Sequence, residues 1–463
     1  MNRSLAIKFG AIALLMLLLL VPLMMIDGLI RERQYLRDGV LEDIARSSSN
    51  SQLISGPVLV VPYRQTVREW KTDAKGKRIQ ESKEVSGRLY LLPDRFELDG
   101  KVQTERRARG IYEARLFHAN NHISGTFVLP AQLGIDEDFA DYRFDEPYLA
   151  VGISDIRGIE NALTLQLGER QLEFMPGTQV SWLGDGVHVT LPRVDGRQQQ
   201  RLDFSFDLAL QGTGQLQVIP VGKTSNVHLS ADWPHPSFIG NYLPTQREVT
   251  EQGFSANWQT SFFSTNPFFS TNLHEAMSNC VDTNRCEAFN ERSFGVSLID
   301  PVDQYLKSDR AIKYALLFIA LTFAGFFLFE VLKRLAVHPI QYALVGAALA
   351  LFYLLLLSLS EHLGFGQAYL VSAGACVGLI GFYTCHVLRS LGHGLGFASA
   401  LAALYGLLYG LLSAEDYALL MGSLLLFCLL GVFMVLTRKI DWYGIGQARA
   451  ADDQPVADEV AHE

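Results

Sequence analysis

The chain has 463 residues, of which 49% are hydrophobic, and its formal net charge at pH 7 is −9. The negative charge argues against a nucleic-acid partner, because a phosphate-binding surface needs clustered Lys and Arg. The mean hydropathy of +0.15 is high for a soluble protein, and the apolar residues gather in one block near the N-terminus and another in the last third of the chain. This uneven distribution is typical of a membrane protein with a large polar domain.

The first apolar block, Phe9 to Ile26, contains no charged residue. It is about 18 residues long, close to the ~20 that a helix needs to cross a bilayer. The block is longer than the apolar core of a secretory signal, and no small-residue cleavage site follows it, so we expect an uncleaved anchor. Arg3 and Lys8 precede the block and should be cytoplasmic by the positive-inside rule. A helix over Ile30 to Ile44 is expected to extend this anchor.

Alternating apolar and polar residues dominate the middle region, residues 31–310. Val187 to Leu191, Leu202 to Leu208 and Val227 to Ala231 alternate in this way, with turn signals such as Asp195-Gly196 between them. Alternation with a period of two predicts strands that bury one face. About a dozen such strands predict a mainly-β, sandwich-like domain or two smaller β units, and the alternation does not choose between these alternatives.

A proline-rich loop in this region combines rigidity with large aromatic side chains. Pro234 and Pro236 flank His235, between Trp233 and Phe238, and Tyr242 follows. One interpretation is a self-packed turn that covers a strand edge. The other is a contact site for a periplasmic protein or lipid headgroups, with the aromatic residues as preorganised anchors. The candidate interaction residues are Trp233, His235, Phe238 and Tyr242.

Two cysteines in the middle region, Cys280 and Cys286, are a candidate disulfide, because the bacterial periplasm is oxidising. The other three, Cys376, Cys385 and Cys428, lie in apolar segments and should stay reduced.

The second apolar block predicts five further spans, at about residues 311–332, 340–359, 367–388, 396–412 and 417–436. Lys333, Arg334, Arg389, Arg438 and Lys439 place alternate loops in the cytoplasm. Both termini should therefore be cytoplasmic and the middle domain periplasmic. The glycine pairs Gly374/Gly378 and Gly406/Gly410 are expected to permit close helix contact.

These patterns divide the chain into four parts and define its fold class, a membrane α + β protein. The expected parts are an anchor (1–30), a periplasmic β-rich domain (31–310), a five-helix bundle (311–437) and an acidic, disordered tail (438–463).

A search for catalytic motifs yields no complete set, and we expect no catalytic residue, cofactor or metal. His274-Glu275 lacks the second histidine of a zinc-protease helix, because Ser278 stands in its place. His118, His122, His188, His228 and His235 lack the sequence spacing of metal ligands. Glu330 and Glu361 sit near span ends, where they are expected to reach water, so the charged relay of a transporter is not evident.

Short motifs along nearly the whole chain resemble the CreD family of inner-membrane proteins, also described as colicin-tolerance or cell-envelope-integrity proteins. The motifs are Ser55-Gly56-Pro57, Asp155-Ile156-Arg157-Gly158, Ser230 to Phe238, Ser308-Asp309-Arg310-Ala311, His338-Pro339-Ile340-Gln341-Tyr342, Ser360-Glu361-His362 and Arg438 to Tyr443. The segment Ser278 to Arg292 departs from the family pattern. The resemblance implies an envelope role in the stress response, and it supplies no reaction.

The leading hypothesis is a non-enzymatic, multi-pass inner-membrane protein whose β domain contacts envelope components. A transporter or lipid-handling protein is the first alternative, and an enzyme acting on envelope lipid or cell wall is the second. The expected partners are the lipid bilayer and a periplasmic protein or envelope lipid, and the oligomeric state stays open.

Overall fold

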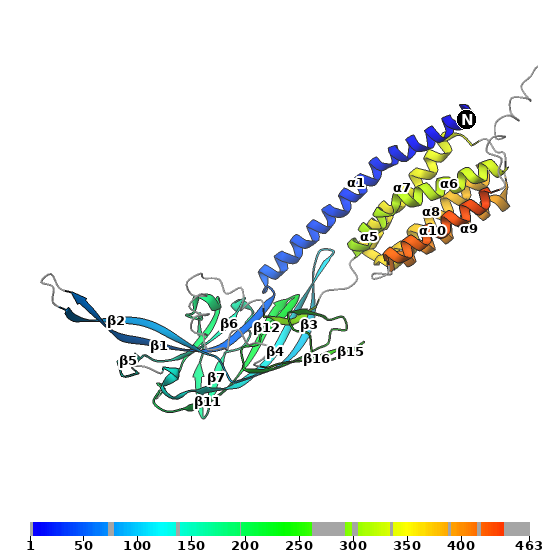
Figure 1. Cartoon of the computed structure of the whole chain (residues 1–463). Coiled ribbons are helices and arrows are strands. Elements are labelled where there is room, and N and C mark those ends of the chain that lie inside the picture. The colour runs from blue at the N-terminus through cyan, green and yellow to red at the C-terminus, as the bar shows by residue number, and fades with distance from the viewer. Residues whose placement is uncertain are drawn as a thin grey trace, which may run out of the picture. The chain divides into compact units, whose positions relative to one another are not determined.

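The computed structural model describes residues 3–72, 78–135, 139–194, 196–261, 292–298, 304–333, 337–387, 390–413 and 418–438. The chain folds into two compact units: a helical unit of Met1–Asp38 with Val302–Glu463, and a β unit of Gly39–Pro301. Helix α1 (Arg3–Ser47) gives its first part to the helical unit and its last turns to the β unit (Figure 1). The expected helical extension over Ile30–Ile44 is thus confirmed.

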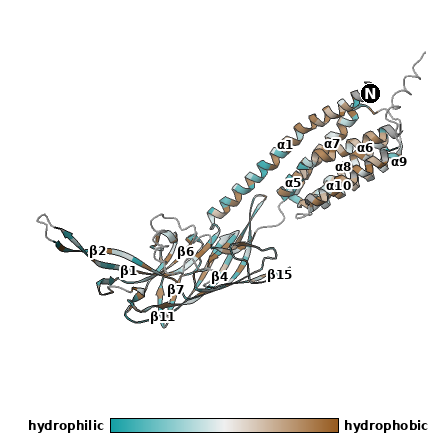
Figure 2. Cartoon of the chain, viewed as in Figure 1, coloured by the Kyte–Doolittle hydropathy of each residue, from teal (hydrophilic) through white to brown (hydrophobic). Residues whose placement is uncertain are grey.

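The helical unit continues with the helices expected from the second apolar block. They are α5 (Gln304–Lys313), α6 (Ala315–Lys333), α7 (Pro339–Leu363), α8 (Phe365–Val387), α9 (Leu391–Ser413) and α10 (Ala418–Thr437). In the described part of the chain, α1, α7, α8 and α9 are each long and apolar enough to cross a bilayer. The pair α5 and α6, bent by 47°, adds a fifth candidate, and α10 coincides with the last expected span. Figure 2 shows the hydrophobic character of α6 to α10.

Small residues control packing in the helical unit, but not the ones that the sequence pattern suggested. A Cβ atom added to Gly346 of α7 would lie 2.4 Å from Leu19 of α1 and 2.8 Å from Phe323 of α6. By contrast, a Cβ added to Gly374, Gly378, Gly406 or Gly410 would meet nothing within 4 Å among the described residues. Within the described residues these four glycines therefore make no close helix contact.

The β unit consists of two mixed sheets. The nine-stranded sheet A has the order β14-β17-β12-β1-β6-β10-β9, with β2 and β5 also paired to β1. Its strands are β1 (Gln52–Thr72), β2 (Arg78–Leu91), β5 (Tyr142–Phe144), β6 (Tyr148–Ile153), β9 (Met175–Pro176), β10 (Gly186–Thr190), β12 (Gln215–Ile219), β14 (Ser237–Gly240) and β17 (Phe294–Ser297).

The eight-stranded sheet B has the order β15-β16-β13-β3-β4-β11-β7-β8. Its strands are β3 (Arg95–Arg109), β4 (Tyr112–Leu129), β7 (Thr164–Leu167), β8 (Arg170–Glu173), β11 (Gln200–Thr213), β13 (Thr224–Ala231), β15 (Gln246–Thr250) and β16 (Gly253–Thr260). The pairs β1–β12 and β3–β13 are parallel, whereas the other pairs are antiparallel. Short 3₁₀ helices at Ala131–Gly134, Phe139–Asp141, Ile156–Gly158 and Ser181–Leu183 complete the unit.

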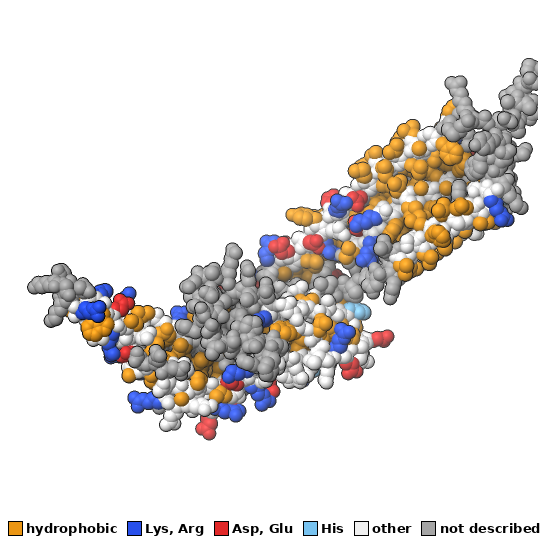
Figure 3. Space-filling view, viewed as in Figure 1, with side chains coloured by type: hydrophobic (Ala, Val, Ile, Leu, Met, Phe, Trp, Pro, Cys, Tyr) orange, Lys and Arg blue, Asp and Glu red, His pale blue; other side chains and the backbone are white. Residues whose placement is uncertain are grey.

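One hydrophobic core joins the two sheets. The core cluster contains Val60 and Phe294 of sheet A together with Phe96, Phe117 and Trp258 of sheet B. The rings of Trp258 and Phe294 stack with centroids 5.3 Å apart, which shows that the sheets pack face to face. The β unit is therefore sandwich-like, and the alternative of two separate β units is not needed. Figure 3 shows charged side chains on the surface of this unit and hydrophobic ones over the helical unit.

A dense polar network attaches the end of α1 to the sandwich. The carboxylate of Asp155 accepts hydrogen bonds from the backbone N–H of Asn50 (3.0 Å) and the guanidinium of Arg157 (2.6 Å). Arg157 also donates to the carbonyl of Arg46 in α1 (2.8 Å). The hydrogen bond from Arg157 and those from the backbone hold the pKa of Asp155 at about 2. The Asp155–Gly158 motif thus has a structural role, since it fixes the helix–sheet junction.

Candidate functional site

A buried carboxylate, Glu330 of α6, lies in the helical unit and is 4% exposed. It forms an ion pair with Lys8 of α1. Its carboxylate also accepts hydrogen bonds from the hydroxyl of Tyr342 (3.0 Å) and the backbone N–H of Val337 (3.2 Å). The expectation that Glu330 reaches water was wrong, because α1, α6 and the start of α7 enclose it. A charge removed from water needs such partners.

A second carboxylate, Glu361 near the end of α7, has a similar environment. It accepts a hydrogen bond from the hydroxyl of Tyr305 in α5 (3.1 Å), and Nε of Arg33 in α1 lies 3.7 Å from Oε1. The Glu361 side chain is 12% exposed. The guanidinium of Arg37 lies 5.8 Å from the centre of the Tyr305 ring.

These two charge clusters hold α1 against the other helices at both ends of its apolar part. Residues 8 and 33 are separated by about 38 Å along a helix, more than the ~30 Å of a bilayer core. Helix α1 therefore runs antiparallel to α6 and parallel to α7, as alternating crossings require. His338 caps α7 by accepting from the backbone N–H of Ile340 (3.3 Å). The motifs around His338–Tyr342 and Glu361 thus serve helix packing.

The aromatic loop divides between core and surface. Trp233 is 7% exposed and belongs to the hydrophobic core, and its indole N–H donates to the carbonyl of His235 (2.9 Å). The guanidinium of Arg115 covers its ring at 3.7 Å, a cation–π contact. His235 is exposed. Trp233 therefore supports the loop from within, and His235 is the side chain that it presents to solvent.

Phe238 and Tyr242 are half-buried at the junction of the two sheets. The Phe238 ring contacts Phe254 and Trp258 edge-to-face, each at 5.7 Å between centroids. Tyr242 contacts Phe294 edge-to-face at 6.0 Å, and its carbonyl accepts from the indole N–H of Trp258 (3.1 Å). Both residues pack on the core while one part of each faces solvent.

Histidines and carboxylates alternate in one row across the solvent-facing side of sheet B. Strand register aligns Asp207, His122, Asp99 and His228 on β11, β4, β3 and β13. His122 pairs with Asp207 at 2.7 Å, and His228 pairs with Asp99 at 3.0 Å. In the part of the chain that the structure describes, no group of three or more His, Cys, Asp or Glu residues is positioned to hold a metal.

His118 and His188 have other roles in the β unit. His118 lies between Glu160 (2.9 Å) and Glu105 (3.1 Å). Burial lowers its pKa, but hydrogen bonds to the two carboxylates outweigh burial, and the pKa is raised above its ordinary value. His188 is 8% exposed and bonds to the carbonyl of Gly177. The histidines therefore do not converge.

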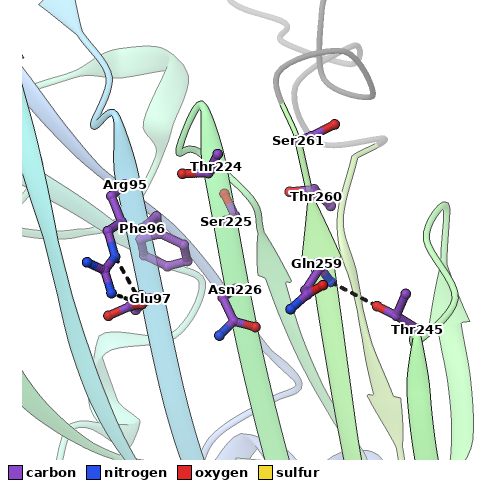
Figure 4. A pocket seen from close by; sticks show the side chains of 10 residues that line it. All are labelled: Arg95, Phe96, Glu97, Thr224, Ser225, Asn226, Thr245, Gln259, Thr260 and Ser261. Atoms are coloured by element: carbon purple, nitrogen blue, oxygen red, sulfur yellow. Dashed lines mark hydrogen bonds and ion pairs between the residues drawn. The ribbon is translucent and has the colours of Figure 1, made fainter.

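A polar cleft opens at one end of sheet B and has a volume of about 600 Å³ (Figure 4). Three adjacent strands, β3, β13 and β16, supply most of its lining, together with Thr245 before β15. The lining residues are Arg95, Phe96, Glu97, Thr224, Ser225, Asn226, Thr245, Gln259, Thr260 and Ser261. Nine of these ten residues are polar, and we call this site the polar cleft.

The candidate disulfide, Cys280–Cys286, lies outside the described residues, as does the expected tail from residue 439. Cys376, Cys385 and Cys428 are free thiols, as predicted.

Sequence reasoning missed the polar cleft and the Lys8–Glu330 pair. Each depends on residues far apart in the chain, 322 positions in the case of Lys8 and Glu330. The available signals were a charged residue at each end of the first apolar helix and a Glu within an apolar helix. Which of these charges form a pair can be seen only once the arrangement of the helices is known.

Comparison with known proteins matches nearly the whole chain. The family model described as "Inner membrane protein CreD" matches residues 4–443. The chain is 38% identical over 437 residues to Inner membrane protein CreD from Escherichia coli (strain K12), covering 94% of this chain and 92% of that protein.

Solved structures give weaker matches. An M1 zinc metallopeptidase from Deinococcus radiodurans is 12% identical, with 36% of this chain and 38% of that chain covered and a TM-score of 0.20. A putative nutrient binding protein from Legionella pneumophila is 8% identical, with 38% and 66% covered and a TM-score of 0.21. Likenesses at this level carry no argument about function.

Proposed function

Because the chain belongs to the CreD family of inner-membrane proteins, we propose that it is a non-enzymatic protein of envelope integrity and stress response whose β unit lies in the periplasm and contacts envelope components. The observation that carries this proposal is the solvent-facing side of sheet B. It is a broad polar surface with a cleft, and its histidines and carboxylates are paired with one another instead of being grouped around a reactive centre.

Orientation is part of the proposal. The Lys8–Glu330 and Arg33–Glu361 contacts give α1 and α6 opposite directions, and the loop charges favour a cytoplasmic N-terminus. Two sites on the β unit are the candidates for contact with an envelope component. One is the polar cleft, and the other is the loop with His235 exposed above the buried Trp233.

The transporter alternative gains one observation, because Glu330 is a buried carboxylate in an apolar helix. However, Lys8, Tyr342 and Val337 already surround it, so helix attachment accounts for the cluster. An enzyme of envelope lipid or cell wall would need a paired acid and base in a cavity. The polar cleft contains one carboxylate, Glu97, and Arg95 neutralises it.

The test is complementation of cells that lack the gene. Full-length protein should restore exclusion of a hydrophobic dye that intact envelopes keep out. A variant with Lys8→Met and Glu330→Met keeps the β unit unchanged. Dye exclusion in cells with this variant shows whether the buried ion pair of the helical unit is needed for protection. If the deletion strain excludes the dye as well as cells that carry the gene do, under envelope stress as well as normal growth, the proposed function is refuted.

The contact itself is tested by photo-crosslinking in intact cells. A photoreactive amino acid at Gln259 or His235 should capture an envelope component, whereas one at Gln171, an exposed residue of the distant edge strand β8, should capture less. Equal capture at all three positions would show that neither candidate site is used.

A further inference from the structure

We propose that the polar cleft binds a neutral, hydroxyl-rich ligand, namely a sugar unit of an envelope glycan. This inference rests on the proposed function, because it assigns a chemical class to the envelope component that the β unit contacts. Three properties of the cleft support it: its balanced charge, the spacing of its amides and the isolation of its carboxylate.

The charge of the lining favours a neutral ligand. Arg95 and Glu97 are the charged residues among the ten that line the cleft. The guanidinium of Arg95 donates twice to Oε1 of Glu97, at 3.0 Å and 2.5 Å. A phosphate or carboxylate ligand would meet a guanidinium that is already neutralised, and an ammonium ligand would meet a carboxylate that is already neutralised.

The amides of the cleft are spaced by the sheet. Strand register places Glu97, Asn226 and Gln259 side by side on β3, β13 and β16, so adjacent side chains are about 4.8 Å apart at the backbone. Neither Asn226 nor Gln259 makes a side-chain hydrogen bond with another described residue, and both are exposed. Each amide offers a donor and an acceptor, which matches a hydroxyl group, since a hydroxyl also donates and accepts.

The arrangement supports binding and not cleavage. Hydrolysis of a glycosidic bond uses two carboxyl groups on opposite sides of the bond, and Glu97 is the one carboxylate in the lining. Phe96, the aromatic residue of the lining, is fully buried, so it offers no exposed ring for a sugar to stack on. Affinity should therefore be low, with a dissociation constant on the order of 1 mM for a small probe.

The experiment uses full-length protein in lipid nanodiscs, which avoid sugar-based detergents, and N,N′-diacetylchitobiose as the probe. Saturation-transfer NMR should detect binding. The double variant Asn226→Leu with Gln259→Leu should weaken it about tenfold, because two hydrogen-bonding groups are lost. The control is Gln103→Leu, which changes an exposed amide of β3 outside the cleft and should bind as the unaltered chain does.

Two further measurements complete the test. The single variant Asn226→Leu removes one of the two amides and should also weaken binding, so it replaces the double variant if that one does not fold. Sedimentation with insoluble cell-wall glycan distinguishes an envelope polymer from a free sugar, because the polymer should carry the unaltered chain down and leave the double variant in solution.

The inference is overturned if the unaltered chain shows no saturation transfer, or if the cleft variants and Gln103→Leu bind the probe equally. It is also overturned if the cleft variants lose probe binding yet sediment with the polymer. Dye exclusion in cells separates this failure from that of the proposed function. Protection without glycan binding rejects the inference alone, whereas a deletion strain with an intact barrier rejects the proposed function.

Discussion

Polar side chains serve different purposes in the two units of the molecule. In the helical unit, Glu330 and Glu361 are enclosed, and each holds a cation of α1. On the outer side of sheet B, pairs such as Arg95–Glu97 and His122–Asp207 stay in contact with solvent. An unpaired charge is costly in an apolar environment and cheap in water. Polar residues of the helical unit therefore determine helix packing, whereas those of sheet B are available to a ligand.

The largest effect should come from the helical unit. Glu330→Lys places two cations together in an enclosed site and should destabilise the protein by about 3–5 kcal/mol, the usual cost of breaking a buried pair. Adding Lys8→Glu restores opposite charges and should recover part of this loss. Thermal unfolding in micelles measures both. If Glu330→Lys unfolds like the unaltered chain, the enclosed charge does not determine packing, and the comparison between the units fails.

Asp155 belongs to the β unit, but its ion pair should contribute to stability as the enclosed pairs of the helical unit do, because the residue is only 8% exposed. Its pKa is lowered from 3.8 to about 2, so its contribution of about 2 kcal/mol is complete above pH 4 and is lost as the pH falls to 2. Asp155→Asn should lose this stability at pH 7 and flatten the acid response. Denaturant midpoints between pH 7 and pH 2 test this, and an unchanged acid response in the variant would contradict it.

Gly346 and Gly374 provide a matched pair within the helical unit. Gly346→Leu overfills the contact among α1, α6 and α7 and should cost about 1–3 kcal/mol, whereas Gly374→Leu points into open space and should cost little. The measurement is protease resistance of the full chain in membranes. A larger loss from Gly374→Leu would show that this glycine is covered, for instance by a second copy of the chain.

The loop should show the smallest change in stability. His235→Ala removes an exposed side chain and should alter unfolding by less than about 0.5 kcal/mol, while Phe238→Ala removes core contacts and should cost more. If the loop is a contact site, His235→Ala lowers envelope protection at normal protein abundance. Val249→Ala, at an exposed position of β15, is the control. If envelope protection falls in proportion to protein abundance in all three variants, the loop contributes to stability alone.

Sequence reasoning succeeded where a local pattern dictates the structure. Period-two alternation located strands such as β11 and β13, and apolar length located α1 and α7. It could not decide how sheets pair, because the stacking of Trp258 on Phe294 joins segments that lie on different sheets. The environment of Glu330 was misjudged for the same reason, since position along a helix does not say which helix covers it.

The candidate site was harder to predict than the fold. The sequence singled out Trp233, but its two interpretations differ in the burial of its side chain, and burial depends on Arg115 and on core residues that are distant in the sequence. The polar cleft leaves no motif in the sequence. Its residues are ordinary strand positions, and only the register of β3, β13 and β16 brings Glu97, Asn226 and Gln259 together.

Topology mapping tests the central claim, that the β unit faces the periplasm, most directly. Reporter fusions after Asn50, Gly240 and Glu361 should read as periplasmic, and those after Arg389 and Trp442 as cytoplasmic, because six crossings with cytoplasmic termini satisfy the loop charges. The fusion after Gly240 is decisive, since it lies at the end of β14 in the β unit. A periplasmic signal there supports envelope contact, and a cytoplasmic signal would contradict the whole account.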